Sequence, residues 1–260
     1  MLSYTKYIHE NSNTWVTFVH GAGGSSIIWH KQVREFKKHF NVLLLDLKGH
    51  GASVSSDFVE ELNDLYTFDS LAEDIIEVVN YEKIDKSHFI GISLGTIIIR
   101  TLAEKHPERV QSMVMGGAIM QLGFKSRLIL RMGMLLKKVV PYHKLYNVIT
   151  FLIMPYKNHK ESRNLFIKES KKLYKEEFLK WFRLAVEINP MLRFFRSAEI
   201  KIPTLYIMGE EDYLFLPAIR KIADKHSSSN LFVVQDCGHV VNVEQPKLYN
   251  NMVIGYLSGF

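Results

Sequence analysis

The chain has 260 residues, of which 47% are hydrophobic and 23% are charged, proportions that exclude a disordered or collagen-like protein. Its single cysteine, Cys237, excludes an internal disulfide framework. No apolar run reaches the roughly 18 residues that a membrane-spanning helix needs. The first residues also lack the apolar core of a secretory signal, so we expect a cytoplasmic protein.

The positive charge is concentrated in one internal segment. The chain has a formal net charge of +6, yet residues 124–201 alone hold 18 Lys and Arg against 6 Asp and Glu. Such a segment can attract an anionic ligand or a membrane surface, whereas the simpler interpretation is the solvated face of amphipathic helices. Nucleic acid is not an expected partner, because no recognition motif or aromatic stacking platform accompanies the charge.

Strand and helix signals alternate in chain order. The predicted strands are apolar throughout, which is typical of strands buried on both faces of a parallel sheet. They cover residues 15–19, 42–45, 88–90, 110–115, 204–208 and 231–234, after a short strand over residues 4–9. Helices are predicted over residues 28–40, 68–81 with Asp69 or Ser70 as the cap, 96–105, 217–226, and after Pro246. This order predicts a doubly wound sheet with ligands beyond the carboxyl ends of its strands.

Residues 119–198 interrupt the alternation with consecutive helical signals rich in Met, Leu, Lys and Arg. We interpret them as a helical cap inserted into a core formed by residues 1–118 and 199–260. Several methionines in or near this segment can either line an apolar pocket or pack in the core: Met113, Met115, Met120, Met132, Met134 and Met154.

A Gly-Ile-Ser-Leu-Gly motif at residues 91–95 lies between a predicted strand and a predicted helix. A serine on such a sharp turn has an exposed hydroxyl, and the small flanking residues allow the close backbone approach that the turn requires. The helix that follows favours negative charge at its N-terminus. The motif therefore predicts a nucleophile at Ser93, against the alternative of an ordinary tight turn.

A glycine-rich segment, His-Gly-Ala-Gly-Gly at residues 20–24, follows the strand that ends at residue 19. Its backbone N–H groups can approach a ligand, and those of Ala22 and Leu94 can together hold a developing oxyanion. A dinucleotide loop is the alternative, but Ser26 stands where that motif needs its third glycine. We expect His20, Asp46 and His50 to shape the loops beside the site.

An acid and a histidine follow the last two predicted strands. Asp212 comes after the strand over residues 204–208, with Glu210 and Glu211 as nearby rivals. His239 comes after the strand over residues 231–234 and before the final helix. An acid past one strand end can reach a histidine on the next loop.

Together these motifs resemble the α/β-hydrolase family, in which the order along the chain is Ser, acid, His. The resemblance covers nearly the whole chain outside residues 119–198. It implies the α/β-hydrolase fold, a doubly wound and mostly parallel sheet with an inserted helical cap, whose usual opening hairpin is here cut to one strand. It also implies a serine hydrolase with Ser93 as nucleophile, His239 as base, Asp212 as the orienting acid and an oxyanion hole at Ala22 and Leu94. No cofactor or metal is expected.

The substrate implied by the resemblance is a small-molecule carboxylic ester with a short or medium acyl chain, and the ester can be apolar or anionic. Alternatives of the same class are a monoacylglycerol or lysophospholipid lipase, a thioesterase and a carbon–carbon bond hydrolase. A serine at position 93 argues against the related dehalogenases and epoxide hydrolases, which use a carboxylate nucleophile. A different class remains open, a ligand-sensing signalling protein that retains the three residues.

Overall fold

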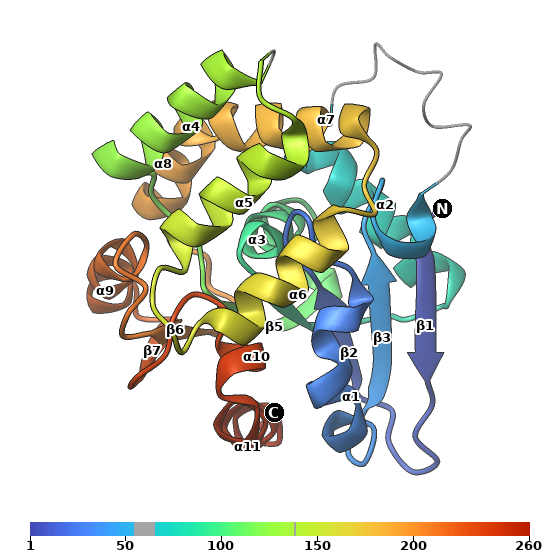
Figure 1. The fold of residues 1–260 in the computed structure, drawn as a ribbon. Coiled ribbons are helices and arrows are strands. Elements are labelled where there is room, and N and C mark those ends of the chain that lie inside the picture. The colour runs from blue at the N-terminus through green and yellow to red at the C-terminus, as the bar shows by residue number, and fades with distance from the viewer. Residues whose placement is uncertain (55–65, 138) are drawn as a thin grey trace.

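The computed structural model of the chain describes residues 1–54, 66–137 and 139–260. Within this part, seven strands form one sheet in the order β1-β3-β2-β4-β5-β6-β7 (Figure 1). β1 runs antiparallel to β3, and the other neighbouring strands are parallel. The strands are β1 (Ser3–Tyr7), β2 (Trp15–Val19), β3 (Asn41–Asp46), β4 (Ser87–Ile92), β5 (Val110–Gly116), β6 (Thr204–Gly209) and β7 (Ser229–Val234). The predicted mostly parallel sheet is thereby confirmed.

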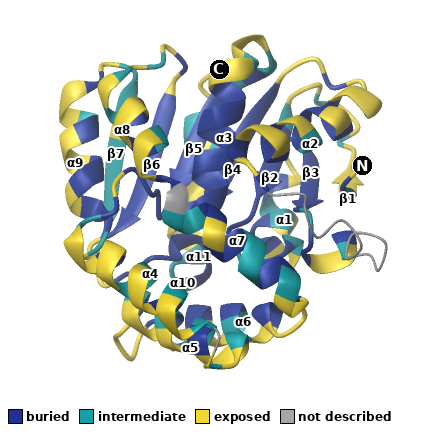
Figure 2. Cartoon of the chain, turned by 90° about the horizontal axis from the view of Figure 1, so that it is seen from above, coloured by how far each residue is buried: buried dark blue, intermediate teal, exposed yellow. Residues whose placement is uncertain are grey.

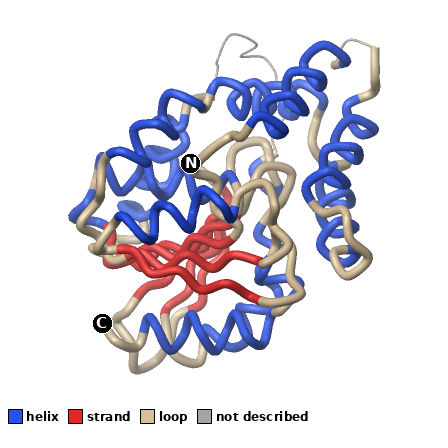
Figure 3. The backbone as a smooth tube through the Cα atoms, turned by 90° about the vertical axis from the view of Figure 1, so that its left-hand side faces the viewer, coloured by secondary structure: helices blue, strands red, loops and turns tan. Residues whose placement is uncertain are grey.

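The sheet is covered on both faces, and its central strands are among the most buried parts of the molecule (Figure 2). Successive side chains of a strand point to opposite faces, so Leu43 and Leu45 of β3 pack in one core cluster and Val42 and Leu44 in another. The first cluster contains α2 (Phe68–Tyr81), α3 (Leu94–Lys105) and α9 (Leu216–Lys225). The second contains α1 (His30–Phe36), α10 (Val241–Glu244) and α11 (Pro246–Leu257), and Figure 3 shows the sheet edge-on between helices.

The first predicted helix and the cap residue of the second differ from the sequence prediction. The helix expected over residues 28–40 is a 3-10 turn (Ser26–Trp29) followed by α1, which ends at Phe36. The chain then turns to enter β3, where the N–H of Asn41 donates to the carbonyl of Thr14 at 2.9 Å. The cap of α2 is Thr67 and not Asp69 or Ser70. Thr67 and Ser70 instead form a reciprocal capping box, which satisfies two backbone donors at the helix start.

Between β5 and β6, where the cap was predicted, the described residues form five helices: α4 (Phe124–Leu136), α5 (Tyr142–Ile153), α6 (Lys160–Ser170), α7 (Lys175–Glu187) and α8 (Asn189–Ser197). We keep the name cap for residues 119–198, and this division of the chain stays an interpretation. In Figure 1 the cap helices lie above the sheet, on the side of the carboxyl ends of the parallel strands. None of the helices described in the structure is long and apolar enough to span a membrane.

Candidate active site

Ser93 lies on a strained turn between β4 and α3. Its backbone has φ 54° and ψ −124°, a conformation that costs a non-glycine residue about 1–3 kcal/mol and persists only where the surroundings impose it. The surroundings here are very close. A Cβ at Gly95 would lie 2.5 Å from the carbonyl oxygen of His20, and one at Gly91 would lie 2.6 Å from Ile99 Cδ1. Gly95 is thus required by its contact with backbone, whereas a side chain at Gly91 would need Ile99 to move.

The structure brings the three predicted side chains together at the carboxyl edge of the sheet. Ser93 Oγ lies 2.9 Å from Nε2 of His239, and Nδ1 of His239 lies 2.8 Å from Oδ2 of Asp212. Both are hydrogen-bond distances, although the loops come from β4, β6 and β7. With its Nδ1–H donated to the buried Asp212 carboxylate, the imidazole leaves Nε2 free to accept the serine proton.

The rival carboxylates point elsewhere. Glu210 is exposed, and the carboxylate of Glu211 contacts His159 instead of His239. Asp236, which has φ 50°, makes no described contact with the His239 ring. Among the described residues, Asp212 is therefore the carboxylate that orients the imidazole.

The predicted oxyanion donors lie beside Ser93. Ala22 and Leu94 line the same cavity as Ser93 and His239. Their backbone N–H groups donate to no acceptor in the described part of the chain, whereas the neighbouring Gly23 N–H donates to Nε2 of His50 at 2.8 Å. Leu94 is also the first residue of α3, where the helix dipole favours negative charge. The arrangement can receive an oxyanion.

His20, Asp46 and His50 hold the loops around these donors. His20 accepts the Leu47 N–H at 2.9 Å, and Asp46 accepts two backbone N–H groups, including that of Ser26 at 2.7 Å. Burial lowers the pKa of both histidines, so both rings are neutral and can accept hydrogen bonds. These contacts match the structural role expected from the sequence.

Comparisons with known proteins agree with this fold. A family model described as the alpha/beta hydrolase fold matches residues 14–137. The 3-oxoadipate enol-lactonase 1 of Acinetobacter baylyi is 25% identical over 247 residues, which are 93% of this chain and 88% of that protein. The crystal structure of the enol-lactonase from Burkholderia xenovorans superposes with a TM-score of 0.83 at 21% identity, covering 99% of this chain and 96% of that chain. A thermophilic esterase from Thermogutta terrifontis gives 0.80 at 18% identity, covering 99% and 93%. The chain has the α/β-hydrolase fold, and the relatives that it matches are hydrolases.

The hydrolase has an apolar cavity of about 160 Å³ between core and cap, with Ser93 and His239 in its wall. No Lys, Arg, Asp or Glu is among its described lining residues. The lining is mainly aliphatic and aromatic, and includes Leu122, Ile129, Leu130, Tyr146, Ile149, Ile153, Met154, Phe166, Phe178, Trp181, Phe182, Ile188 and Phe215. The cavity therefore suits an uncharged, apolar group.

Both of the alternatives considered for the methionines occur. Of the six methionines considered, only Met154 is among the lining residues. Met113 and Met115 pack in the core beneath α2 and α3, and Met132 is exposed. The aromatic residues of α7 that line the cavity, Phe178 and Phe182 among them, were missed. The amphipathic spacing of α7 was the only sign of them in the sequence.

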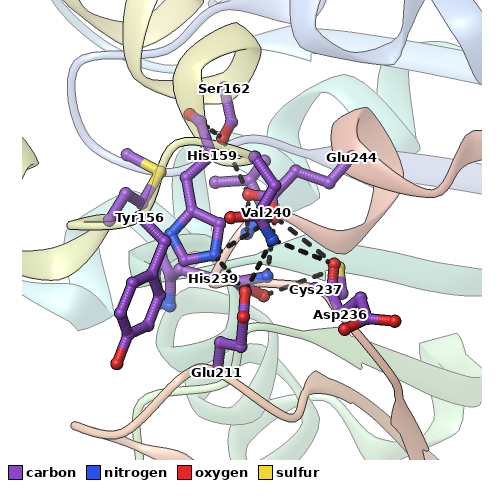
Figure 4. A network of polar contacts seen from close by, with 12 residues as sticks. Tyr156, His159, Ser162, Glu211, Asp236, Cys237, His239, Val240 and Glu244 are labelled. Atoms are coloured by element: carbon purple, nitrogen blue, oxygen red, sulfur yellow. Dashed lines mark hydrogen bonds and ion pairs between the residues drawn. The ribbon is translucent and has the colours of Figure 1, made fainter.

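A buried polar cluster joins the cap of the hydrolase to the loops that carry Asp212 and His239 (Figure 4). His159, between α5 and α6, is fully buried, and its Nε2 lies 2.7 Å from a Glu211 carboxylate oxygen and 3.9 Å from one of Glu244. That Glu244 oxygen accepts the N–H of Gly238 at 2.6 Å. One cap side chain thus contacts carboxylates anchored beside both the acid and the base.

Two neighbours of His159 extend the cluster. Ser162 donates to Glu244 at 2.7 Å, and Asn158 donates to Glu211 at 2.7 Å and to the carbonyl of Asp236 at 3.1 Å. The hydrogen bonds from Asn158 and then His159 lower the pKa of Glu211. No local motif could have predicted these contacts, because the cap residues and their partners are at least 52 residues apart along the chain. Across the described residues, no group of His, Cys, Asp and Glu side chains has the arrangement of metal ligands.

Proposed function

We propose that this hydrolase cleaves carboxylic esters with a small or medium apolar acyl chain, through Ser93, His239 and Asp212. The observation that carries the proposal is the hydrogen-bonded series from Ser93 through His239 to Asp212, with Ser93 in the wall of an uncharged apolar cavity. A nucleophile, a base and an orienting acid at these distances are the requirements of acyl transfer.

The reaction begins when Nε2 of His239 takes the proton of Ser93 while Oγ attacks the ester carbonyl carbon. Asp212 stabilises the imidazolium, and the N–H groups of Ala22 and Leu94 stabilise the oxyanion of the tetrahedral intermediate. The imidazolium then gives its proton to the leaving alcohol, which leaves an acyl-enzyme. Water, deprotonated by His239, attacks this ester, and the acid leaves as Ser93 regains its proton.

The acyl chain, more than the alcohol, determines the substrate class in this proposal. Among the described residues that line the cavity there is no Lys, Arg, Asp or Glu, and burying an unpaired carboxylate there would cost several kcal/mol. The anionic alternative is therefore weaker than the apolar one, even though the cap is basic. Relatives whose names include enol-lactonase and esterase support an ester as the bond that is broken.

Labelling with a fluorophosphonate probe tests the nucleophile. We expect covalent labelling of the wild-type protein and none of Ser93→Ala. Ser126→Ala is the matched control, because Ser126 lines the same cavity but has no role in the proposed reaction, so this variant should be labelled like the wild type. Labelling that survives in Ser93→Ala and is lost in Ser126→Ala would disprove the assignment.

A panel of 4-nitrophenyl esters graded by acyl length and charge tests the substrate class. We expect kcat/KM to rise with acyl length until the cavity is filled, and to be lower for a hemisuccinate ester than for the neutral ester of equal length. Ser93→Ala should lower kcat/KM by at least about 10³-fold. A wild-type protein that is labelled yet hydrolyses each ester only once would instead be a ligand sensor.

A further inference from the structure

The outer face of α4 is apolar. Phe124, Leu128, Met132 and Leu135 are spaced by four, four and three residues, so they lie on one side of the helix. All four are exposed, Phe124 at 74% and Leu135 at 78%. The solvent side of a helix on a globular protein is normally polar. Packing within this fold therefore does not explain why these four positions are apolar.

The next helix continues the pattern. Val148, Phe151 and Leu152 of α5 are exposed, and α4 and α5 pack against each other (Figure 1). The inner sides of the same helices line the cavity, with Ile129 from α4 and Ile149 from α5. Two neighbouring helices are therefore apolar both toward the cavity and toward the outside.

The charged side chains of α4, α5 and the residues that flank them are all positive. Residues 124–160 contain no Asp or Glu. On the outward sides of α4 and α5, Arg127, Arg131 and Lys144 are exposed and form no ion pair with a described residue. The Lys and Arg of the segment are Lys125, Arg127, Arg131, Lys137, Lys138, Lys144, Lys157 and Lys160.

We propose that the outer faces of α4 and α5 form a docking surface for an anionic lipid bilayer. In this arrangement Phe124, Leu128, Leu135 and their exposed neighbours enter the boundary between headgroups and acyl chains. The flanking arginines and lysines lie at the level of the lipid phosphates. Exposed aromatic and aliphatic side chains flanked by Lys and Arg are the combination that binds such interfaces.

Charge argues against the other occupants of an apolar face. A second copy of the chain would bring two segments of the same positive sign together, which costs free energy in a self-complementary interface. A protein partner would have to present an apolar face together with acidic side chains to match the outward sides of these two helices. A bilayer surface supplies both a broad apolar layer and negative charge.

The docking surface also places the cavity next to the lipid. Because α4 and α5 contribute side chains to both surfaces, an ester dissolved in the bilayer would be separated from the cavity that contains Ser93 by these two helices. This consequence rests on the proposed function, whereas binding itself does not.

Co-sedimentation of the full chain with vesicles tests the docking surface without any turnover. We expect binding to vesicles of phosphatidylglycerol and phosphatidylcholine, little binding to phosphatidylcholine alone, and loss of binding as salt is raised. Each basic residue near an anionic surface is worth about fivefold in affinity, so Arg127→Glu with Arg131→Glu should weaken binding by at least about tenfold. Phe124→Ser with Leu135→Ser should weaken it by a similar factor.

Matched changes on the core serve as controls. Arg220→Glu with Lys221→Glu makes the same charge change on α9, and Ile8→Ser removes an exposed apolar side chain far from the cap. Both should bind like the wild type. The proposal is overturned if the wild type ignores anionic vesicles, or if cap and core variants lose binding equally. It is also overturned if sedimentation velocity shows a dimer that Leu135→Ser dissociates, since the face would then bind a second copy.

Discussion

The carboxyl edge of the sheet, which we call the rim, carries Ser93, Asp212 and His239. The rim and the cap meet at one cavity, but they are held in place by different kinds of contact. At the rim, backbone packs on backbone. A Cβ at Gly209 would lie 2.0 Å from the carbonyl oxygen of Gly238, so the loops that carry Asp212 and His239 touch without side chains between them. The cap is joined to these same loops by side chains, and the His159 cluster is one of the polar contacts between them.

This difference indicates that the rim and the cap have different roles in the reaction. Reacting groups need to be held within a fraction of an ångström, and close backbone packing provides that. A wall formed by side chains can change its lining without moving the reacting groups. We therefore expect substitutions at the rim to reduce the rate of the chemical step, and those in the cap to alter substrate binding.

The largest effect should come from the acid at the rim. Asp212→Asn keeps the shape but presents an amide to the imidazole and favours the wrong tautomer, so kcat should fall by about 10⁴-fold. Glu210→Gln, an exposed change two residues away, should stay near the wild-type value. Steady-state kinetics on a 4-nitrophenyl ester measures both, and equal losses in the two variants would remove Asp212 from the proposed reaction.

Acid should destabilise the core through its buried histidines. Burial, with a smaller effect of Lys86, lowers the pKa of His88 to about 4. As the pH falls, the His88 ring is therefore protonated in the unfolded chain before it is protonated in the folded chain. The free energy of unfolding then falls as the pH drops from about 6.5 toward 4. The slope from one such histidine is about 1.4 kcal/mol per pH unit.

Urea unfolding at several pH values measures this slope. His88→Gln should reduce it by about 1 kcal/mol per pH unit, whereas His143→Gln, an exposed change in the cap, should leave it alone. An unchanged slope in His88→Gln would mean that the ring titrates alike in the folded and unfolded chains.

The smallest effect should come from the contact between the two regions. His159→Ala removes the side chain that joins the cap to Glu211 and Glu244, so the cavity wall is held less firmly. We expect KM to rise severalfold with kcat nearly unchanged, as when a contact that stabilises the bound substrate and the transition state equally is lost. The control His143→Ala should change neither constant. A loss in kcat alone would show that His159 positions the rim and not the wall.

The sequence predicted the rim better than the cap for a physical reason. Ser93, Asp212 and His239 each follow a strand end, and parallel strands bring their carboxyl ends to one edge, so local motifs were enough. The His159 cluster and the aromatic lining of α7 depend on how five cap helices pack together. No short motif encodes that packing. The spacing of the methionines could not decide between cavity and core, because it does not say which side of an element meets the cavity.

The left-handed backbone of Ser93 also limits which residues can act in its place. Threonine carries the same hydroxyl, but its branched Cβ is poorly tolerated at φ 54°. An unbranched side chain such as cysteine fits the turn. A new nucleophile at this position must therefore first fit the backbone conformation, and its reactivity matters only after that. Ser93→Cys is thus the starting point for redesigning the chemistry of this enzyme.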